Sequence, residues 1–236
     1  MRFKMFSYES NQEVFYSIIN NIIERLEKDD YHSWDFINRL SKNGWVPPLS
    51  LDCYEYFQCH SSELSDEDIE LGLIDFFEDN YDNVFFKIIN LEEDQNPFLH
   101  KLMCEVMQAY NQQLYQICIP SLFSILERYL AELSNDGDLN KVRYGAGLER
   151  KIGMRNNDGG ELPYQFVNSC YLIKKYLDQY FKATDFENCN SLNRHAFAHG
   201  RQQYYATKVD VIKLIFIVTN IISMYYKVEI ISNEVS

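Results

Sequence analysis

Apolar residues recur along most of this chain at steps of three and four, the spacing that places them on one face of an α-helix. Between Asn11 and Lys28, six aliphatic residues follow this spacing and form one stripe. No segment shows the alternation of apolar and polar residues that predicts a half-buried strand. We therefore expect an all-α protein. The further helices expected are Tyr31–Leu40, one from Ser65 through Phe77, Phe98–Tyr110, Ile117–Leu133, Leu162–Phe181, Asn190–His199 and Thr207–Val228.

Local signals mark two of these helix starts. Ser65 is followed three residues later by Asp68, and this spacing predicts a helix whose first turn is capped by the serine. Pro120 has no backbone N–H, so it fits either the first turn of its helix or a kink in one longer helix.

The chain divides into two parts of different charge. Glu92–Pro97 is polar, charged and closed by proline, and we place a boundary there. Residues 1–96 are expected to form an acidic N-terminal helical module, and residues 97–236 a helical bundle. The first part holds 7 basic and 21 acidic residues, and the second 15 basic and 14 acidic residues. The net charge of −13 argues against broad, non-specific nucleic-acid binding, but the near-neutral second part can still bind one phosphate group.

Three features of the sequence bear on where the protein acts. The first ten residues lack the apolar run of a signal peptide. The most apolar segment, Leu214–Tyr226, is shorter than the roughly 20 residues of a membrane span, so we expect a core helix there. The six cysteines are scattered without a CxxC pair, which favours reduced thiols. Together these features favour a cytoplasmic protein without a membrane partner.

The densest group of chemically capable side chains lies in Ser191–Tyr205, SLNRHAFAHGRQQYY. His195 and His199 are four residues apart and share a helix face. Arg194 precedes them, and Gly200 is expected where the helix ends, because glycine accepts the backbone conformation of a C-terminal cap. A guanidinium and an imidazole that face one cavity can bind a phosphate and transfer a proton.

The run Leu192–Arg201 resembles the signature of HEPN (higher eukaryotes and prokaryotes nucleotide-binding) domains. Their pattern is Arg, a polar residue, three further positions and then His, on a late helix of a four- to five-helix bundle; here the polar position is His195. Ile119–Glu127 resembles the earlier bundle helix, whose acidic residue faces the motif. The match covers residues 97–230, and residues 1–96 look like a helical module found ahead of such domains in bacterial proteins.

The resemblance implies a metal-independent endoribonuclease that works as a homodimer, with the motifs of both subunits at one cleft. Such domains recur in toxin–antitoxin, abortive-infection and CRISPR-associated systems, so an antitoxin or regulatory protein is a candidate partner. Many members have lost catalysis. The alternative is therefore a non-catalytic binding or regulatory module that acts through protein–protein contacts. Neither function needs a cofactor.

Cleavage of RNA by its own 2′-OH needs a base, an acid and a cation beside the phosphate. His199 can serve as base or acid, and Arg194 can hold the phosphate through two parallel hydrogen bonds. His195 is the supporting polar group, and Glu127 could orient Arg194 or His199 from the neighbouring helix. The expected product is a 2′,3′-cyclic phosphate. Further RNA contacts are expected from Asn193, Arg201, Tyr205, Lys141 and Arg143.

Each of these assignments has a plainer alternative. An Arg/His pair beside a glycine can be a helix-end salt bridge, and the basic stretch Lys141–Arg155 can be a solvated loop instead of a route for RNA. Tyr204 and Tyr205 could stack on a base or pack into the core. The two histidines of the motif could bind zinc with Cys189 as a third ligand, although the glutamate of HExxH helices is missing.

Overall fold

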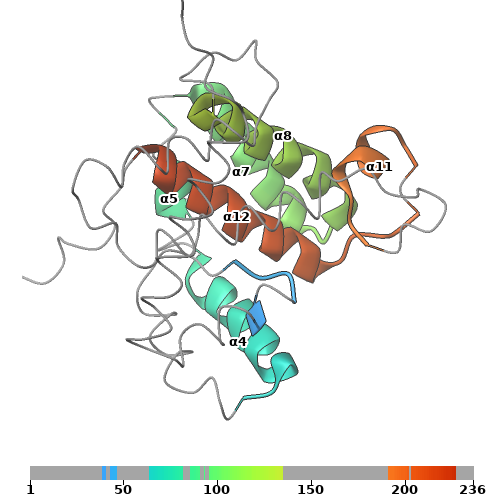
Figure 1. Cartoon of the computed structure of the whole chain (residues 1–236). Coiled ribbons are helices and arrows are strands. Elements are labelled where there is room, and N and C mark those ends of the chain that lie inside the picture. Colours follow the sequence, from blue (N-terminus) through green and yellow to red (C-terminus); the bar gives the residue numbers. More distant parts are fainter. Residues whose placement is uncertain are drawn as a thin grey trace, which may run out of the picture.

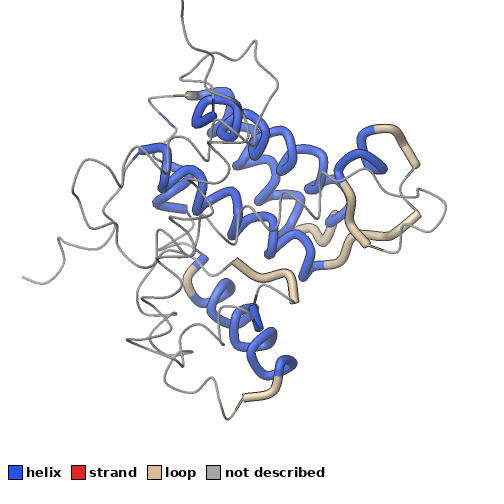
Figure 2. The backbone as a smooth tube through the Cα atoms, in the orientation of Figure 1, coloured by secondary structure: helices blue, strands red, loops and turns tan. Residues whose placement is uncertain are grey.

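The computed structural model describes residues 39–40, 43–46, 64–81, 86–90, 93, 96–134, 191–201 and 203–226. Within these ranges the regular structure is helical and no strand is present (Figures 1 and 2). This confirms the all-α prediction for the part of the chain that the structure describes. The helices are α4 (Asp66–Asp79), α5 (Phe86–Asn90), α7 (Pro97–Asn111), α8 (Tyr115–Ser134), α11 (Arg194–Ala198) and α12 (Lys208–Tyr226).

Several predicted elements fall outside the described residues. The helices expected at Asn11–Lys28 and Leu162–Phe181 belong to this group, as does the basic stretch with Lys141 and Arg143. Of the helix expected at Tyr31–Leu40, the last two residues are described, and both are helical.

Helix α4 starts as its sequence predicts. The Ser65 hydroxyl accepts a hydrogen bond from the Asp68 N–H (3.1 Å), and the Asp68 carboxylate accepts one from the Ser65 N–H (3.1 Å). These reciprocal bonds satisfy two backbone donors that the first helical turn leaves open. The Ser65 hydroxyl, followed by its N–H, also lowers the pKa of the Asp68 carboxyl. The helix then buries Ile69, Leu73 and Phe77.

Helices α7 and α8 form a hairpin closed by a residue in the left-handed conformation. Gln113 has φ +60°; its N–H donates to the Tyr110 carbonyl (2.9 Å), and the Leu114 N–H donates to the Ala109 carbonyl (2.9 Å). This pair of bonds is a Schellman motif, which ends α7 and reverses the chain. Pro120 lies inside α8 as its sixth residue; of the two positions predicted for it, the first turn is therefore wrong, and the proline lies within a helix that starts earlier than expected, at Tyr115.

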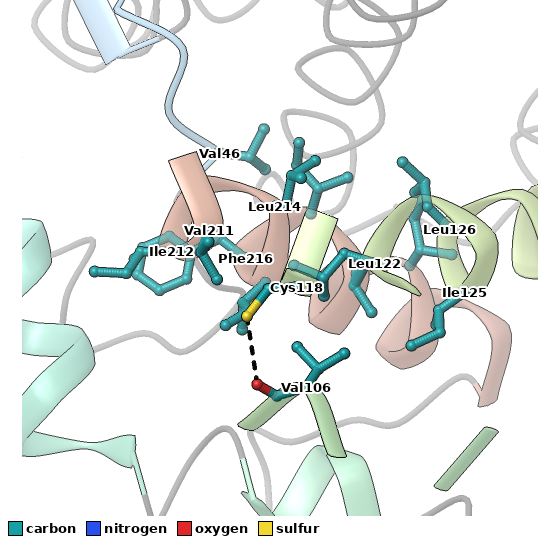
Figure 3. Close-up of a cluster of buried hydrophobic side chains, with 14 of the residues drawn as sticks. Val46, Val106, Cys118, Leu122, Ile125, Leu126, Val211, Ile212, Leu214 and Phe216 are labelled. Atoms are coloured by element: carbon teal, nitrogen blue, oxygen red, sulfur yellow. Dashed lines mark hydrogen bonds between the residues drawn. The ribbon is translucent and has the colours of Figure 1, made fainter. Parts of the chain in front are cut away.

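Helix α12 is the centre of the core. It packs against α8 on one side and against α4 and α5 on the other, and α7 covers α8 (Figure 1). In Figure 3, side chains of α8 and α12 meet together with Val46 from the segment before α4. Cys118 of α8 is fully buried there: its thiol donates to the Val106 carbonyl (3.6 Å), and burial raises its pKa to about 11. Such a thiol stays protonated and acts as a core side chain.

The core continues across the predicted boundary at residue 96. The Phe216 ring of α12 lies 5.7 Å from the Trp45 ring and 5.8 Å from the Phe77 ring, measured between ring centroids. All three side chains are fully buried. The described residues before and after residue 96 therefore share one hydrophobic core, and the division into two domains stays a prediction.

A polar contact fixes the same junction. The Glu70 carboxylate oxygen Oε2 accepts hydrogen bonds from the Trp45 indole N–H (3.0 Å) and from the Lys213 ammonium (3.1 Å). The Lys213 Nζ atom also lies 4.8 Å from the centroid of the Trp45 ring, within the range of a cation–π interaction. Three segments of the chain are held together by this one carboxylate.

None of the helices that the structure describes is both long enough and apolar enough to cross a membrane. In α12, every residue from Val211 to Ile222 except Lys213 is buried.

Candidate functional site

The motif helix α11 is a single short helix with defined caps at both ends. The Asn193 side chain accepts a hydrogen bond from the Ala196 N–H (3.1 Å) and caps its start. At its end, Gly200 takes φ +64°, with Gly200 N–H to Phe197 carbonyl (3.1 Å) and Arg201 N–H to Ala196 carbonyl (2.8 Å). This is a second Schellman motif and confirms the predicted helix end at Gly200. The helix begins at Arg194 instead of Asn190, because Asn193 occupies the cap.

Arg194 is held by one residue from α8 and one from its own helix. Its Nε forms an ion pair with Glu127 Oε1, an oxygen that is itself buried. Its Nη1 lies 3.4 Å from His195 Nδ1. A guanidinium can only donate, so the imidazole accepts through Nδ1, and the proton of the neutral ring then lies on Nε2. The Arg194 and Glu127 side chains keep 27% and 22% of their surface exposed, so neither side chain is fully buried.

His199 lies at the exposed end of the same helix. It is the C-cap residue, and its N–H donates to the His195 carbonyl (3.2 Å). Its side chain is exposed, and a Cβ built on the adjacent Gly200 would meet no atom within 4 Å. The structure thus joins Arg194, His195 and Glu127 directly and presents His199 to solvent beside open space.

The predicted RNA-contacting residues take different positions. Asn193 is only 1% exposed and its side chain caps α11, so an RNA contact would require the amide to leave the interior. Arg201 and Tyr205 are exposed on the segment that follows α11. Lys141 and Arg143 lie outside the described residues.

Of the two tyrosines after α11, Tyr204 packs against the core and Tyr205 does not. Tyr204 is partly buried and packs against the core, and its hydroxyl donates a hydrogen bond to the Asp210 carboxylate (2.9 Å). Tyr205 is 83% exposed. Next to it, the Ala206 N–H donates to the Gln116 side-chain carbonyl of α8 (2.8 Å), a contact between residues 90 positions apart. The sequence did not predict this contact, since local spacing gives no information about pairs so far apart along the chain.

The zinc alternative gains no support from the described residues. Among them, no group of three or more His, Cys, Asp or Glu side chains is arranged to hold a metal ion. Cys189, the third ligand considered, lies outside them.

A cysteine–histidine pair on α7 was not singled out by the sequence. Cys104 Sγ lies 3.6 Å from His100 Nε2, and Asn90 Oδ1 lies 3.3 Å from the same nitrogen. In a nucleophile–base–orienter chain the two outer groups bind opposite ring nitrogens, which is not the case here. Burial raises the pKa of the Cys104 thiol, and the charges of Glu93 and Glu105 raise it further, which disfavours the thiolate that a nucleophile needs.

The chain matches no protein-family model, and it shows no significant similarity to a curated protein or to a solved structure. What the protein does is therefore inferred from the motif and from the geometry around it.

Proposed function

We propose that this protein is a metal-independent endoribonuclease of the HEPN type, with Arg194 and His199 as its catalytic residues. The observation that carries the proposal is the Glu127–Arg194 ion pair. Glu127 of α8 holds the guanidinium of Arg194 at the start of α11. The exposed His199 lies at the other end of α11. A fixed cation and an exposed imidazole on one short helix suit phosphodiester chemistry, because preorganised charge at the phosphate stabilises the transition state.

The residues divide the reaction among them. An imidazole of His199 takes the proton of the 2′-OH, the 2′ oxygen bonds to the adjacent phosphorus, and the bond to the 5′ oxygen breaks as that oxygen receives a proton. The products are a 2′,3′-cyclic phosphate and a 5′-OH. The Arg194 guanidinium donates hydrogen bonds to the non-bridging oxygens of the phosphate through Nη1 and Nη2. Glu127 binds at Nε and is a positioning residue, as is His195.

In an in-line displacement the 2′ oxygen and the 5′ oxygen lie on opposite sides of the phosphorus, so one His199 cannot reach both as base and acid in the same step. A two-fold homodimer with both α11 helices at one cleft supplies two such imidazoles, so base and acid come from different subunits. The cellular role proposed is the one that the family resemblance implies, an RNase of a bacterial anti-phage or toxin–antitoxin system held in check by an antitoxin or regulatory protein.

The test is cleavage of single-stranded RNA by the full chain in the presence of a metal chelator. Arg194→Ala and His199→Ala are each expected to lower the rate by at least about 100-fold, the usual contribution of an acid–base group or a phosphate-binding cation. Arg39→Ala and His100→Ala remove the same residue types elsewhere and should leave the rate unchanged. Cleavage that requires Mg²⁺, or that survives both motif variants, would refute the mechanism.

The alternative function is a non-catalytic module on the same helical fold. Seven of the fourteen residues of α4 are acidic and none is basic, which suits contact with a basic protein partner. A chain that never cleaves RNA yet retains a protein partner through α4 would favour this alternative.

A further inference from the structure

The segment between α11 and α12 presents one aromatic ring to solvent from a fixed backbone. Its residues alternate in burial: Tyr204 and Ala206 pack against the core, whereas Gln203 and Tyr205 are exposed. Of the exposed large apolar side chains in the described part of the chain, Tyr205 is the most exposed. A single exposed ring is ordinary on a protein surface. What distinguishes Tyr205 is the anchoring of both its neighbours.

Both flanks of Tyr205 are held by hydrogen bonds. On one side, the Tyr204 hydroxyl donates to Asp210 (2.9 Å), and on the other, the Ala206 N–H donates to Gln116 of α8 (2.8 Å). The next residue, Thr207, caps α12: its N–H donates to Asp210 (2.8 Å) and its hydroxyl accepts from the Asp210 N–H (3.3 Å). The backbone that carries the ring is therefore ordered before any ligand arrives, which lowers the entropy cost of binding.

We propose that Tyr205 is a stacking subsite for one unpaired base of the RNA strand whose phosphate binds at Arg194. This proposal rests on the proposed function for the nature of the strand. Tyr205 follows His199 by six residues, so the two lie at most about 20 Å apart along the chain. In a duplex the faces of the bases are covered by their neighbours, so the ring selects single-stranded RNA or a loop.

The net charge of the protein favours a contact to RNA that does not depend on charge. With a net charge of −13, the chain repels a polyanion at long range, and phosphate contacts alone give weak binding. Stacking on an aromatic ring does not depend on charge and is tolerant of base identity. Stacking on Tyr205 thus adds binding affinity that the negative net charge does not reduce. Because the stacked base must be unpaired, the subsite requires single-stranded RNA or a loop.

The test is binding of a fluorescent single-stranded 2′-O-methyl RNA, which cannot be cleaved through its 2′ oxygen, measured by anisotropy with the full chain. Tyr205→Ala is expected to weaken binding by about tenfold, within the effect of one base–aromatic stack. Tyr205→Phe keeps the ring and should bind as the wild type does. Phe98→Ala removes another exposed ring (73% exposed), on α7, and should have no effect.

A second arm locates the base. Oligonucleotides with one abasic position, moved along the strand, should bind the wild type about tenfold more weakly at one position and should bind Tyr205→Ala with no further loss. Unchanged binding by Tyr205→Ala, an equal loss in Phe98→Ala, or no binding by the wild type would overturn the subsite. Binding that depends on Tyr205, without any cleavage of RNA, would support the stacking subsite and refute the nuclease. Cleavage of RNA together with unaltered binding by Tyr205→Ala would support the nuclease and refute the subsite.

Discussion

The ion pair between Glu127 and Arg194 can be measured as a coupling energy. We expect a double-mutant cycle of Glu127→Gln and Arg194→Ala to give a coupling of about 1–2 kcal/mol in the free energy of unfolding. The side chains keep 22% and 27% of their surface exposed. They therefore lie between exposed pairs, worth about 0–1 kcal/mol, and buried pairs, where removal of one partner costs about 3–5 kcal/mol.

The assay is urea denaturation followed by tryptophan fluorescence, since Trp45 is fully buried in the native state. All four proteins are compared at one concentration, because the stability of the proposed homodimer would depend on it. The matched control is the pair Arg39–Asp66 (2.8 Å), whose side chains are 30% and 57% exposed. Its coupling is expected below about 0.5 kcal/mol and to fade in high salt. A Glu127–Arg194 coupling no larger than this control would refute the claim that α8 fixes the motif arginine.

Further predictions concern backbone strain, the aromatic junction and a buried hydroxyl. Both Gly200 and Gln113 have positive φ, so Gly200→Ala should lower the free energy of unfolding by about 1 kcal/mol and Gln113→Gly should raise it by a similar or smaller amount. Changes of the same sign in urea denaturation would contradict this. Lys213→Met should cost about 1 kcal/mol by removing the contact to Glu70, and an unchanged urea midpoint would argue against it. Burial raises the pKa of Tyr110, so stability should fall as pH rises above about 10, where the unfolded chain loses the proton and the native state keeps it. Tyr110→Phe removes a hydroxyl that is buried without a hydrogen-bond partner among the described residues; it should raise stability by about 1 kcal/mol and flatten this decline, and a loss of stability in thermal melts would contradict it.

Features set by residues within one helical turn could be predicted from the sequence. The cap formed by Ser65 and Asp68 and the helix end at Gly200 are both present, because each depends on side chains and backbone a few residues apart. The end of α7 shows the limit of such reasoning. Gln113 holds the same left-handed conformation as Gly200, but glutamine gives no signal of it, and here the hairpin geometry overrides the local preference.

Contacts between distant segments were only partly predictable. The family resemblance, which places an acidic residue on the facing helix, suggested that Glu127 contacts Arg194 or His199, and the structure shows the contact with Arg194. Spacing could not tell which of Tyr204 and Tyr205 points inward, because that depends on Asp210 and on Gln116 of α8. The catalytic role of the motif stays a proposal, since no contact in the described residues measures activity.

The aromatic contacts of Phe216 limit how far the gene can be trimmed. A fragment starting at Pro97 would lack Trp45 and Phe77, whose rings both lie against Phe216. The flank of α12 that they shield would then meet water, and large bare apolar surfaces promote self-association. Toxicity screens and crystallisation trials on such a fragment would be carried out on aggregated protein, so they should begin with all 236 residues.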